Sequence, residues 1–331
     1  MTRSARISYL IMAVALVLVG WLHLGTLMLT MLFGYFAVRK FSLGRSKTLG
    51  VVLYVLTVAA IACGLVFFLR RAYVALPRMA ETVIPAVVDY AAQQGVEMPF
   101  TDYASLKARV LTEVTEGLGS FGRHARAAAF TIAQLVVGLV VAVSLFLSAR
   151  WGEEPDAQTA PDSLYATVVR ELRERCRTFY RSFSRVIGAQ LLISAINTVL
   201  TAAFLLWHEF PHMLVLTIVT FLCGLLPIVG NILSNTLIVG VAFTLSPKMA
   251  LFALLFLVFI HKLEYFLNSK IIGERIRNPM WLTLLGLVLG EKLMGIPGMI
   301  LAPVVLHYIK VEALRNKSPE TPEDAQQDAG P

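Results

Sequence analysis

Long apolar runs, separated by short basic or polar segments, make up most of this chain. The first run covers residues 7–38 and would form a helix about 48 Å long, whereas the hydrocarbon core of a bilayer is about 30 Å thick. Gly20 and Gly25 interrupt the run, so we expect two short helices that turn between them. Basic residues stand at both ends of the run, which predicts that both ends are cytoplasmic.

A polar region follows the next membrane segment. Residues 48–69 predict an ordinary span. Residues 70–126 predict a small amphipathic subdomain, lateral or extracytoplasmic, with helices expected at 77–94 and 102–118. The apolar run at 127–149 then returns the chain to the cytoplasmic side.

The segment at 150–185 combines a linker with a basic helix. Residues 151–163 are acidic and contain proline, which is typical of a flexible linker. Residues 164–185 place apolar side chains and arginines at helical spacing. Such a helix either lies on the anionic cytoplasmic leaflet or packs on its own subunit, and the sequence leaves both interpretations open.

The central region, residues 186–247, contains no Lys or Arg and a single acid, Glu209. It opens with a span at 186–206, and its second apolar run, at 213–245, is broken at Pro227–Asn231, which predicts a hairpin. Broken helix inside a bilayer is tolerated only where protein or a water-filled cavity covers the freed backbone groups. The break therefore indicates a substrate pathway, and the alternative is a surface loop that joins two short spans.

The last apolar run, residues 281–309, is again too long for one straight crossing. Gly290-Glu291-Lys292 and Gly295-Ile296-Pro297-Gly298 interrupt it, so we expect a third hairpin at these positions. Basic residues flank the run on both sides, which predicts that both of its ends are cytoplasmic.

Composition supports a membrane protein. The 331 residues are 57% apolar and 15% charged, with a mean hydropathy of +0.72, whereas a globular chain is about 45–50% apolar and about 25% charged. The net charge of +8 does not form one patch, so it indicates membrane topology rather than nucleic-acid binding. We expect an all-α, polytopic transmembrane protein of the inner (cytoplasmic) membrane, with both termini cytoplasmic and about eight membrane segments that include broken hairpins. Its expected parts are N-terminal membrane segments (1–69), an amphipathic helical subdomain (70–126), a span (127–149), a linker with a basic amphipathic helix (150–185), a membrane core with two broken hairpins (186–310) and a disordered tail (311–331).

Three charged residues stand out in or beside the apolar runs. Glu291 and Lys292 would each cost about 2.5–3.5 kcal/mol at membrane depth, and would persist there only for function or by mutual pairing. At a hairpin tip in water they would form an ordinary polar turn. Glu264, one turn from the end of its span, is either a proton or cation carboxylate or an interfacial residue paired with a nearby base.

Side-chain amides on otherwise apolar elements are the other candidates. Amides in spans either join helices by hydrogen bonds or bind solute, and both interpretations stay open for Gln190 and Asn197. Asn231 and Asn235 adjoin the helix break and are four residues apart, so they share one face of a helix. The full set of candidate pathway residues is Gln190, Asn197, Pro227, Gly230, Asn231, Asn235, Glu264, Asn268, Glu291, Lys292, Pro297 and Gly298.

The sequence does not support an enzyme. The segment His208-Glu209-Phe210-Pro211-His212 matches H-E-x-x-H, but Pro211 is incompatible with the helix that this zinc site needs, and no third ligand is evident. Neither a Walker A sequence nor a G-x-G-x-x-G sequence is present. We therefore expect no catalytic residue, no bound metal and no nucleotide cofactor.

Several short motifs occur in an order and at a spacing that one known family shares. They are Gln190-Leu191-Leu192, Gly224-Leu225-Leu226-Pro227-Ile228-Val229-Gly230, Glu264 with Ile271-Ile272-Gly273, Gly295-Ile296-Pro297-Gly298 and Ala302-Pro303. On these motifs the chain resembles the autoinducer-2 exporter family of bacterial and archaeal permeases, over most of its length. Two positions depart from the family pattern. Asn268-Ser269-Lys270 stands where a Pro is usual, and Asn231 stands where Pro or a small residue is common.

The resemblance implies transport, since family members are associated with export of autoinducer-2 and, in some cases, with sodium–proton exchange. Our hypothesis is ion- or proton-coupled alternating access for a small polar solute. In it, the broken hairpins at 227–235 and 290–303 meet near the midplane, and Glu264 or Glu291 carries the coupling proton. The alternatives are a passive channel of the same fold and a non-transporting membrane scaffold. The expected partners are the lipid bilayer, the solute, H⁺ or Na⁺ and further copies of the chain in a homo-oligomer, but not nucleic acid.

Overall fold

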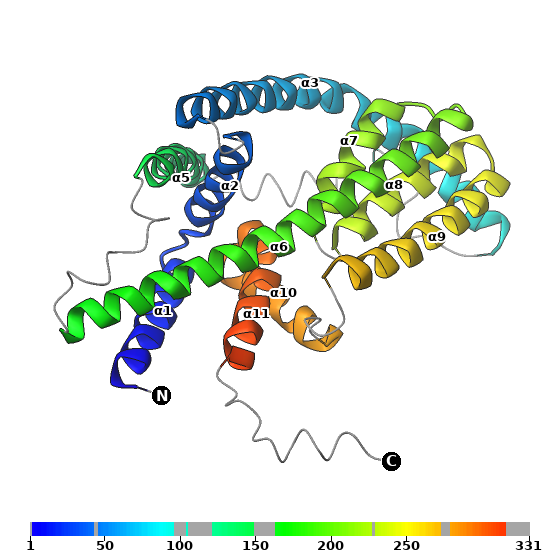
Figure 1. The fold of residues 1–331 in the computed structure, drawn as a ribbon. Coiled ribbons are helices and arrows are strands. Elements are labelled where there is room, and N and C mark those ends of the chain that lie inside the picture. The colour runs from blue at the N-terminus through cyan, green and yellow to red at the C-terminus, as the bar shows by residue number, and fades with distance from the viewer. Residues whose placement is uncertain are drawn as a thin grey trace, which may run out of the picture. The chain divides into compact units, whose positions relative to one another are not determined.

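A computed structural model of the chain describes residues 2–42, 46–95, 104, 121–148, 163–226, 229–272 and 279–315. In these ranges all regular structure is helical, which confirms the all-α fold. The helices are α1 (Arg3–Trp21), α2 (Gly25–Phe41), α3 (Lys47–Gln93), α5 (Phe121–Leu147), α6 (Leu164–Trp207), α7 (Met213–Gly224), α8 (Val229–Leu245), α9 (Pro247–Ile272), α10 (Met280–Met294) and α11 (Ile296–Arg315) (Figure 1).

Several expectations fall mostly or wholly outside the described residues. They concern the helix at 102–118, the linker at 151–163, Pro227 and most of the expected tail at 311–331. The expected start of this tail at residue 311 is wrong, because α11 continues to Arg315.

Six of the described helices are long and apolar enough to cross a membrane, namely α1, α3, α5, α6, α9 and α11. Two more, α7 and α8, are apolar but shorter, with 12 and 17 residues. This pattern confirms a polytopic helical membrane protein, because soluble proteins rarely contain helices that are apolar over such lengths.

Each of the long apolar runs is interrupted, as predicted. Helix α1 ends at Trp21 and α2 begins at Gly25, so the turn lies where the two glycines predicted it. The last run breaks at the predicted Gly295-Ile296-Pro297-Gly298 interruption, whereas the other predicted interruption, at Gly290-Glu291-Lys292, is wrong. Glu291 and Lys292 lie in the last turn of α10, and the chain turns at Gly295, whose φ of 64° suits glycine.

Two helices are longer than expected. We predicted a boundary between a span and a polar region at residue 70, but α3 continues without a break and contains Pro77 and Pro85. Likewise, the basic segment and the span that we separated at residue 186 form one helix, α6. The backbone stays helical through the change in composition at both positions, because Arg, Glu, Ala and Leu are all good helix formers.

The chain divides into two compact units. Unit 1 comprises Met1–Gly25, Pro155–Ala189 and Ser269–Pro331, and unit 2 comprises Thr26–Glu154 and Gln190–Asn268. Helix α6 contributes its first half to unit 1 and its second half to unit 2.

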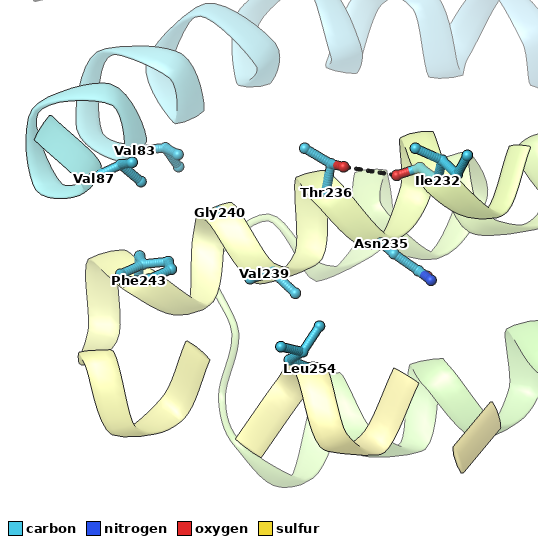
Figure 2. A pocket seen from close by; sticks show the side chains of 9 residues that line it. All are labelled: Val83, Val87, Ile232, Asn235, Thr236, Val239, Gly240, Phe243 and Leu254. Atoms are coloured by element: carbon cyan, nitrogen blue, oxygen red, sulfur yellow. Dashed lines mark hydrogen bonds between the residues drawn. The ribbon is translucent and has the colours of Figure 1, made fainter. Parts of the chain in front are cut away.

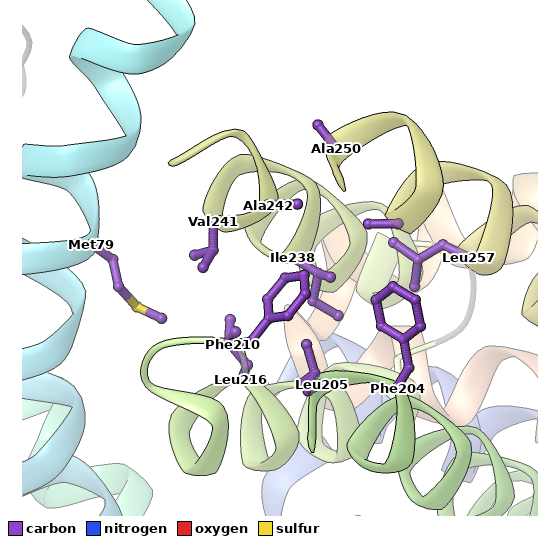
Figure 3. Close-up of a cluster of buried hydrophobic side chains, with 11 residues drawn as sticks. Met79, Phe204, Leu205, Phe210, Leu216, Ile238, Val241, Ala242, Ala250 and Leu257 are labelled. Atoms are coloured by element: carbon purple, nitrogen blue, oxygen red, sulfur yellow. The ribbon is translucent and has the colours of Figure 1, made fainter. Parts of the chain in front are cut away.

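The apolar core of unit 2 lies where α3, α6, α7, α8 and α9 meet (Figure 3). Phe204 of α6 stacks on Phe256 of α9, with ring centroids 4.2 Å apart and an interplanar angle of 9°. Phe210 packs against Phe204 from the connection between α6 and α7, which closes this end of the core. The buried residues of the core are Met79, Phe204, Leu205, Phe210, Leu216, Ile238, Val241, Ala242, Ala250, Ala253 and Leu257.

The α10–α11 hairpin in unit 1 depends on two small residues. A Cβ atom on Gly290 would overlap the carbonyl oxygen of Gly298, and a Cβ atom on Gly298 would overlap that of Gly290. The two backbones therefore approach each other more closely than any side chain permits, as is common where membrane helices pack. This close approach explains the glycine of the Pro297–Gly298 motif as a packing residue.

Candidate functional site

The break between α7 and α8 lies in unit 2 and creates the first part of the site. Helix α7 ends at Gly224, and α8 begins at Val229. A Cβ atom on Gly230 would overlap the carbonyl group of Cys223, so only glycine lets the first turn of α8 return so close to the end of α7. The backbone N–H of Gly230 donates to the carbonyl of Leu226 at 3.2 Å, which continues the tight turn.

Polar side chains on one face of α6 hold the C-terminal end of α7. Gln190 Nε2 donates to the carbonyl of Gly224 at 2.6 Å, and Ser194 Oγ donates to the carbonyl of Phe221 at 2.9 Å. The last carbonyls of a helix have no partner within the helix, so these two bonds satisfy groups that the break would otherwise leave bare. Gln190 therefore joins α6 to α7 by a hydrogen bond to backbone, and joining helices is one of the two roles considered for it.

Glu264 of α9 is the centre of the site. Its Oε2 atom accepts a hydrogen bond from Asn231 Nδ2 of α8 at 2.6 Å and another from Asn197 Nδ2 of α6 at 3.3 Å. Its side chain is 14% exposed. Three of the candidate residues, from three helices and separated by more than thirty positions in sequence, therefore meet at one carboxylate oxygen.

Two oxygen atoms at the site are free to accept hydrogen bonds, one of Glu264 and one of Asn197. Among the described residues, Oε1 of Glu264 accepts no hydrogen bond, and the buried Oδ1 of Asn197 has no partner. The nearest recorded basic group is the exposed His261, whose Nδ1 lies 3.9 Å from Oε2. Asn231 is the third residue of α8, so the carboxylate also faces the positive end of that helix dipole. Glu264 Oε1 and Asn197 Oδ1 are the two oxygen atoms here that no described residue occupies.

Asn235 lies one turn beyond Asn231 but in a different environment. It lines a cavity of about 480 Å³ bounded by α3, α8 and α9 (Figure 2). Both asparagines belong to α8 and are four positions apart, so they lie on one face of this helix, as expected. The side chain of Asn231 contacts Glu264, whereas the side chain of Asn235 makes no hydrogen bond to any described residue.

The remaining candidates are placed elsewhere. Asn268 lies near the C-terminal end of α9. Glu291 and Lys292 belong to unit 1, form an ion pair with each other at 3.6 Å, and have side chains that are 50% and 77% exposed. They form an exposed pair in the last turn of α10. Pro297 lies in the first turn of α11.

A second polar cluster lies in unit 1 and joins α1, α6 and α11. Arg175 is its centre, with Nε donating to Ser8 Oγ at 2.8 Å and Nη2 donating to Glu171 Oε2 at 3.3 Å. The guanidinium carbon lies 3.6 Å from the centroid of the Tyr9 ring. Glu312 Oε2 lies 3.6 Å from Arg175 Nη1 and accepts a hydrogen bond from the Tyr9 hydroxyl at 2.8 Å. These contacts bury the first half of α6 against its own chain, which was one of the two arrangements that we considered.

The H-E-x-x-H segment does not form a helix. Glu209 and His212 have φ values of 51° and 55°, and the segment lies in the connection between α6 and α7. Among the described residues, no group of three or more His, Cys, Asp or Glu side chains is arranged to hold a metal ion.

Sequence reasoning missed Ser194, His261 and the entire Arg175 cluster. Ser194 carried a usable signal, because positions 190, 194 and 197 lie on one face of a helix. Arg175 carried one as well, since it interrupts the apolar positions 168, 172, 179 and 183 on the face of α6 that is buried. Glu312 had no such signal in the sequence.

Comparison with known proteins finds similarity to transport proteins. The relative named "Putative transport protein YdbI", from Bacillus subtilis (strain 168), is 30% identical over 142 residues, which are 42% of this chain and 41% of that relative. The match therefore spans less than half of either protein. No solved structure matches the chain. The model of the family described as "AI-2E family transporter" matches residues 7–315. Since this match covers nearly the whole chain, the protein is a member of the AI-2E transporter family.

Proposed function

We propose that this protein is a secondary transporter that moves a small polar solute in exchange for, or together with, a proton or sodium ion. The observation that carries the proposal is the contact of Asn197, Asn231 and Glu264 beside the α7–α8 break. Ionisable residues on membrane helices are costly and typically mark ion or substrate pathways. Broken helices are the usual place for such sites in secondary transporters.

In this proposal Glu264 binds the coupling ion. Two amide hydrogens occupy its Oε2 atom, which fixes the carboxylate and leaves Oε1 free to accept a proton or to bind a cation. The free Oδ1 atom of Asn197 adds a second acceptor for the ion or for a hydroxyl group of the solute. Autoinducer-2 is the first cargo to test, because the family is named for its export, and sodium–proton exchange is the second.

Flux in proteoliposomes tests the proposal. The purified protein is reconstituted, a pH gradient is imposed, and a pH-sensitive dye is followed while sodium, lithium and then autoinducer-2 are added. We expect dye movement that needs one of these solutes, and we expect Glu264→Gln to reduce it by about tenfold or more, since the amide side chain cannot take up the proton.

The matched control is Glu291→Gln, which removes an exposed carboxylate of unit 1 that contacts Lys292. This variant is expected to retain wild-type flux. Equal flux in both variants would contradict the role of Glu264. Solute that equilibrates while the dye stays silent would show a passive channel, and silence of both would favour a membrane scaffold.

A further inference from the structure

The cavity beside Asn235 is a groove with α8 as its floor and with α3 and α9 as its walls (Figure 2). Its volume of about 480 Å³ lies within the range of about 300–1,000 Å³ typical of small-molecule sites, which are mostly apolar with a few polar groups. The lining follows this pattern. It consists of Val83, Val87, Ile232, Asn235, Thr236, Val239, Gly240, Phe243 and Leu254.

One polar group in this lining has no partner among the described residues. The hydroxyl of Thr236 donates to the carbonyl of Ile232 at 2.8 Å, so it is satisfied within α8. The amide of Asn235 makes no such bond, and Figure 2 shows it extending from α8 toward the side on which Leu254 lies. An unpaired amide in an apolar groove is costly unless a ligand or water binds it.

The groove and the Glu264 site lie along one face of α8, because Asn231, Asn235, Val239 and Phe243 follow one another at intervals of four residues. Asn235 lies about 6 Å along the helix axis from Asn231, which contacts Glu264. In the other direction the floor continues from Asn235 to Phe243 for about 12 Å. One row of side chains along the surface of α8 thus has the Glu264 contact at one end and the apolar groove at the other.

We infer that this surface binds a single-chain amphiphile whose cationic or hydroxyl-bearing head contacts Glu264 and Asn235 and whose apolar tail lies in the groove. Two of the helices around the groove, α3 and α9, are candidate membrane spans. An apolar groove alone gains little there, because lipid tails are as apolar as its walls. Selective binding must therefore come from the polar head, and the carboxylate excludes an anionic one.

Photolabelling tests this inference. The probe is dodecylamine with a diazirine in its tail, and it is added to the full-length protein in nanodiscs. Labels are expected on the segments 83–87 and 232–243. Unlabelled dodecylamine should compete, whereas butylamine, which lacks a long tail, and dodecyl sulfate, which has an anionic head, should not. Equal competition by dodecyl sulfate would overturn the inference.

Two variants block the groove from its exposed edges without entering the core. Ile232→Trp and Leu254→Trp replace side chains that are 65% and 47% exposed and line the groove. Each is expected to reduce labelling by about tenfold. Leu255→Trp is the matched control, because Leu255 is 59% exposed on the same helix and does not line the groove. Equal labelling of all three variants would overturn the inference.

The head contact rests on the proposed function, and Glu264→Gln separates the two claims. If labelling of the groove persists in this variant while flux is lost, the head contact is wrong and the proposed function stands. If labelling depends on Glu264 but no solute is transported by the wild type, the proposed function fails and the amphiphile site stands.

Discussion

Replacing Arg175 by leucine is expected to lower the free energy of unfolding by about 3–5 kcal/mol, the usual effect of removing one partner of a buried ion pair. The side chains of Arg175 and Glu312 are 7% and 5% exposed. Without the guanidinium, Glu312 keeps a buried charge, with the Tyr9 hydroxyl as its one recorded hydrogen-bond donor. The measurement is the midpoint temperature of thermal unfolding of the purified protein in detergent.

Two further variants show whether charge pairing causes the loss. Arg177→Leu removes an exposed arginine of the same helix, and it should change stability by no more than about 0.5 kcal/mol. The double variant Arg175→Leu, Glu312→Leu should recover much of the loss, because apolar residues replace buried ion pairs at little cost. A double variant that is less stable than Arg175→Leu would show that packing, rather than the charges, explains the effect.

Replacing Gly230 by alanine is expected to lower the free energy of unfolding by about 1–3 kcal/mol, as overpacking does. The added methyl group would overlap the backbone carbonyl of Cys223, which cannot move aside as a flexible side chain can. Since α8 carries Asn231, its displacement should also weaken the contact with Glu264 and reduce flux. Thermal unfolding and proteoliposome flux are measured on the same preparation.

Gly64→Ala is the control for this prediction. Gly64 lies inside α3, and a Cβ atom there would have no neighbour within 4 Å. Alanine is a better helix former than glycine, so this variant should be more stable by about 0.5–1 kcal/mol. If Gly230→Ala is as stable as Gly64→Ala, the close approach of α7 and α8 does not need glycine.

Hydropathy and helix length predicted most of the fold. Apolar runs longer than the bilayer had to break, and Gly20–Gly25 and Pro227–Asn231 marked two of the breaks correctly. Composition did not predict that α3 and α6 are continuous. A helix can pass from apolar to polar side chains along its length without any change in its backbone conformation. The third break lies at Gly295, inside the predicted Gly295-Ile296-Pro297-Gly298 interruption, whereas Gly290-Glu291-Lys292, the other predicted interruption, is helical.

The residues of the site could also be identified from the sequence, but the contacts between them could not. Asn197, Asn231 and Glu264 stand out because each is polar in an apolar run. Their association at one oxygen atom depends on how α6, α8 and α9 pack, and local spacing does not determine that packing. Arg175 was overlooked for the opposite reason, since it resembles the five other arginines of a basic segment and differs from them chiefly in the helix face that it occupies.

The hydrogen bonds that Asn197 and Asn231 donate to Oε2 have a consequence for the Glu264→Gln variant. A glutamine whose carbonyl oxygen takes the place of Oε2 keeps both bonds, and its neutral NH₂ group then occupies the position at which a proton would bind. The side chain is therefore a stable mimic of the ion-loaded carboxyl group rather than a simple deletion. We expect this variant to be arrested in the loaded conformation, which makes it the form of the protein to choose for trapping one step of the cycle in an experimental structure.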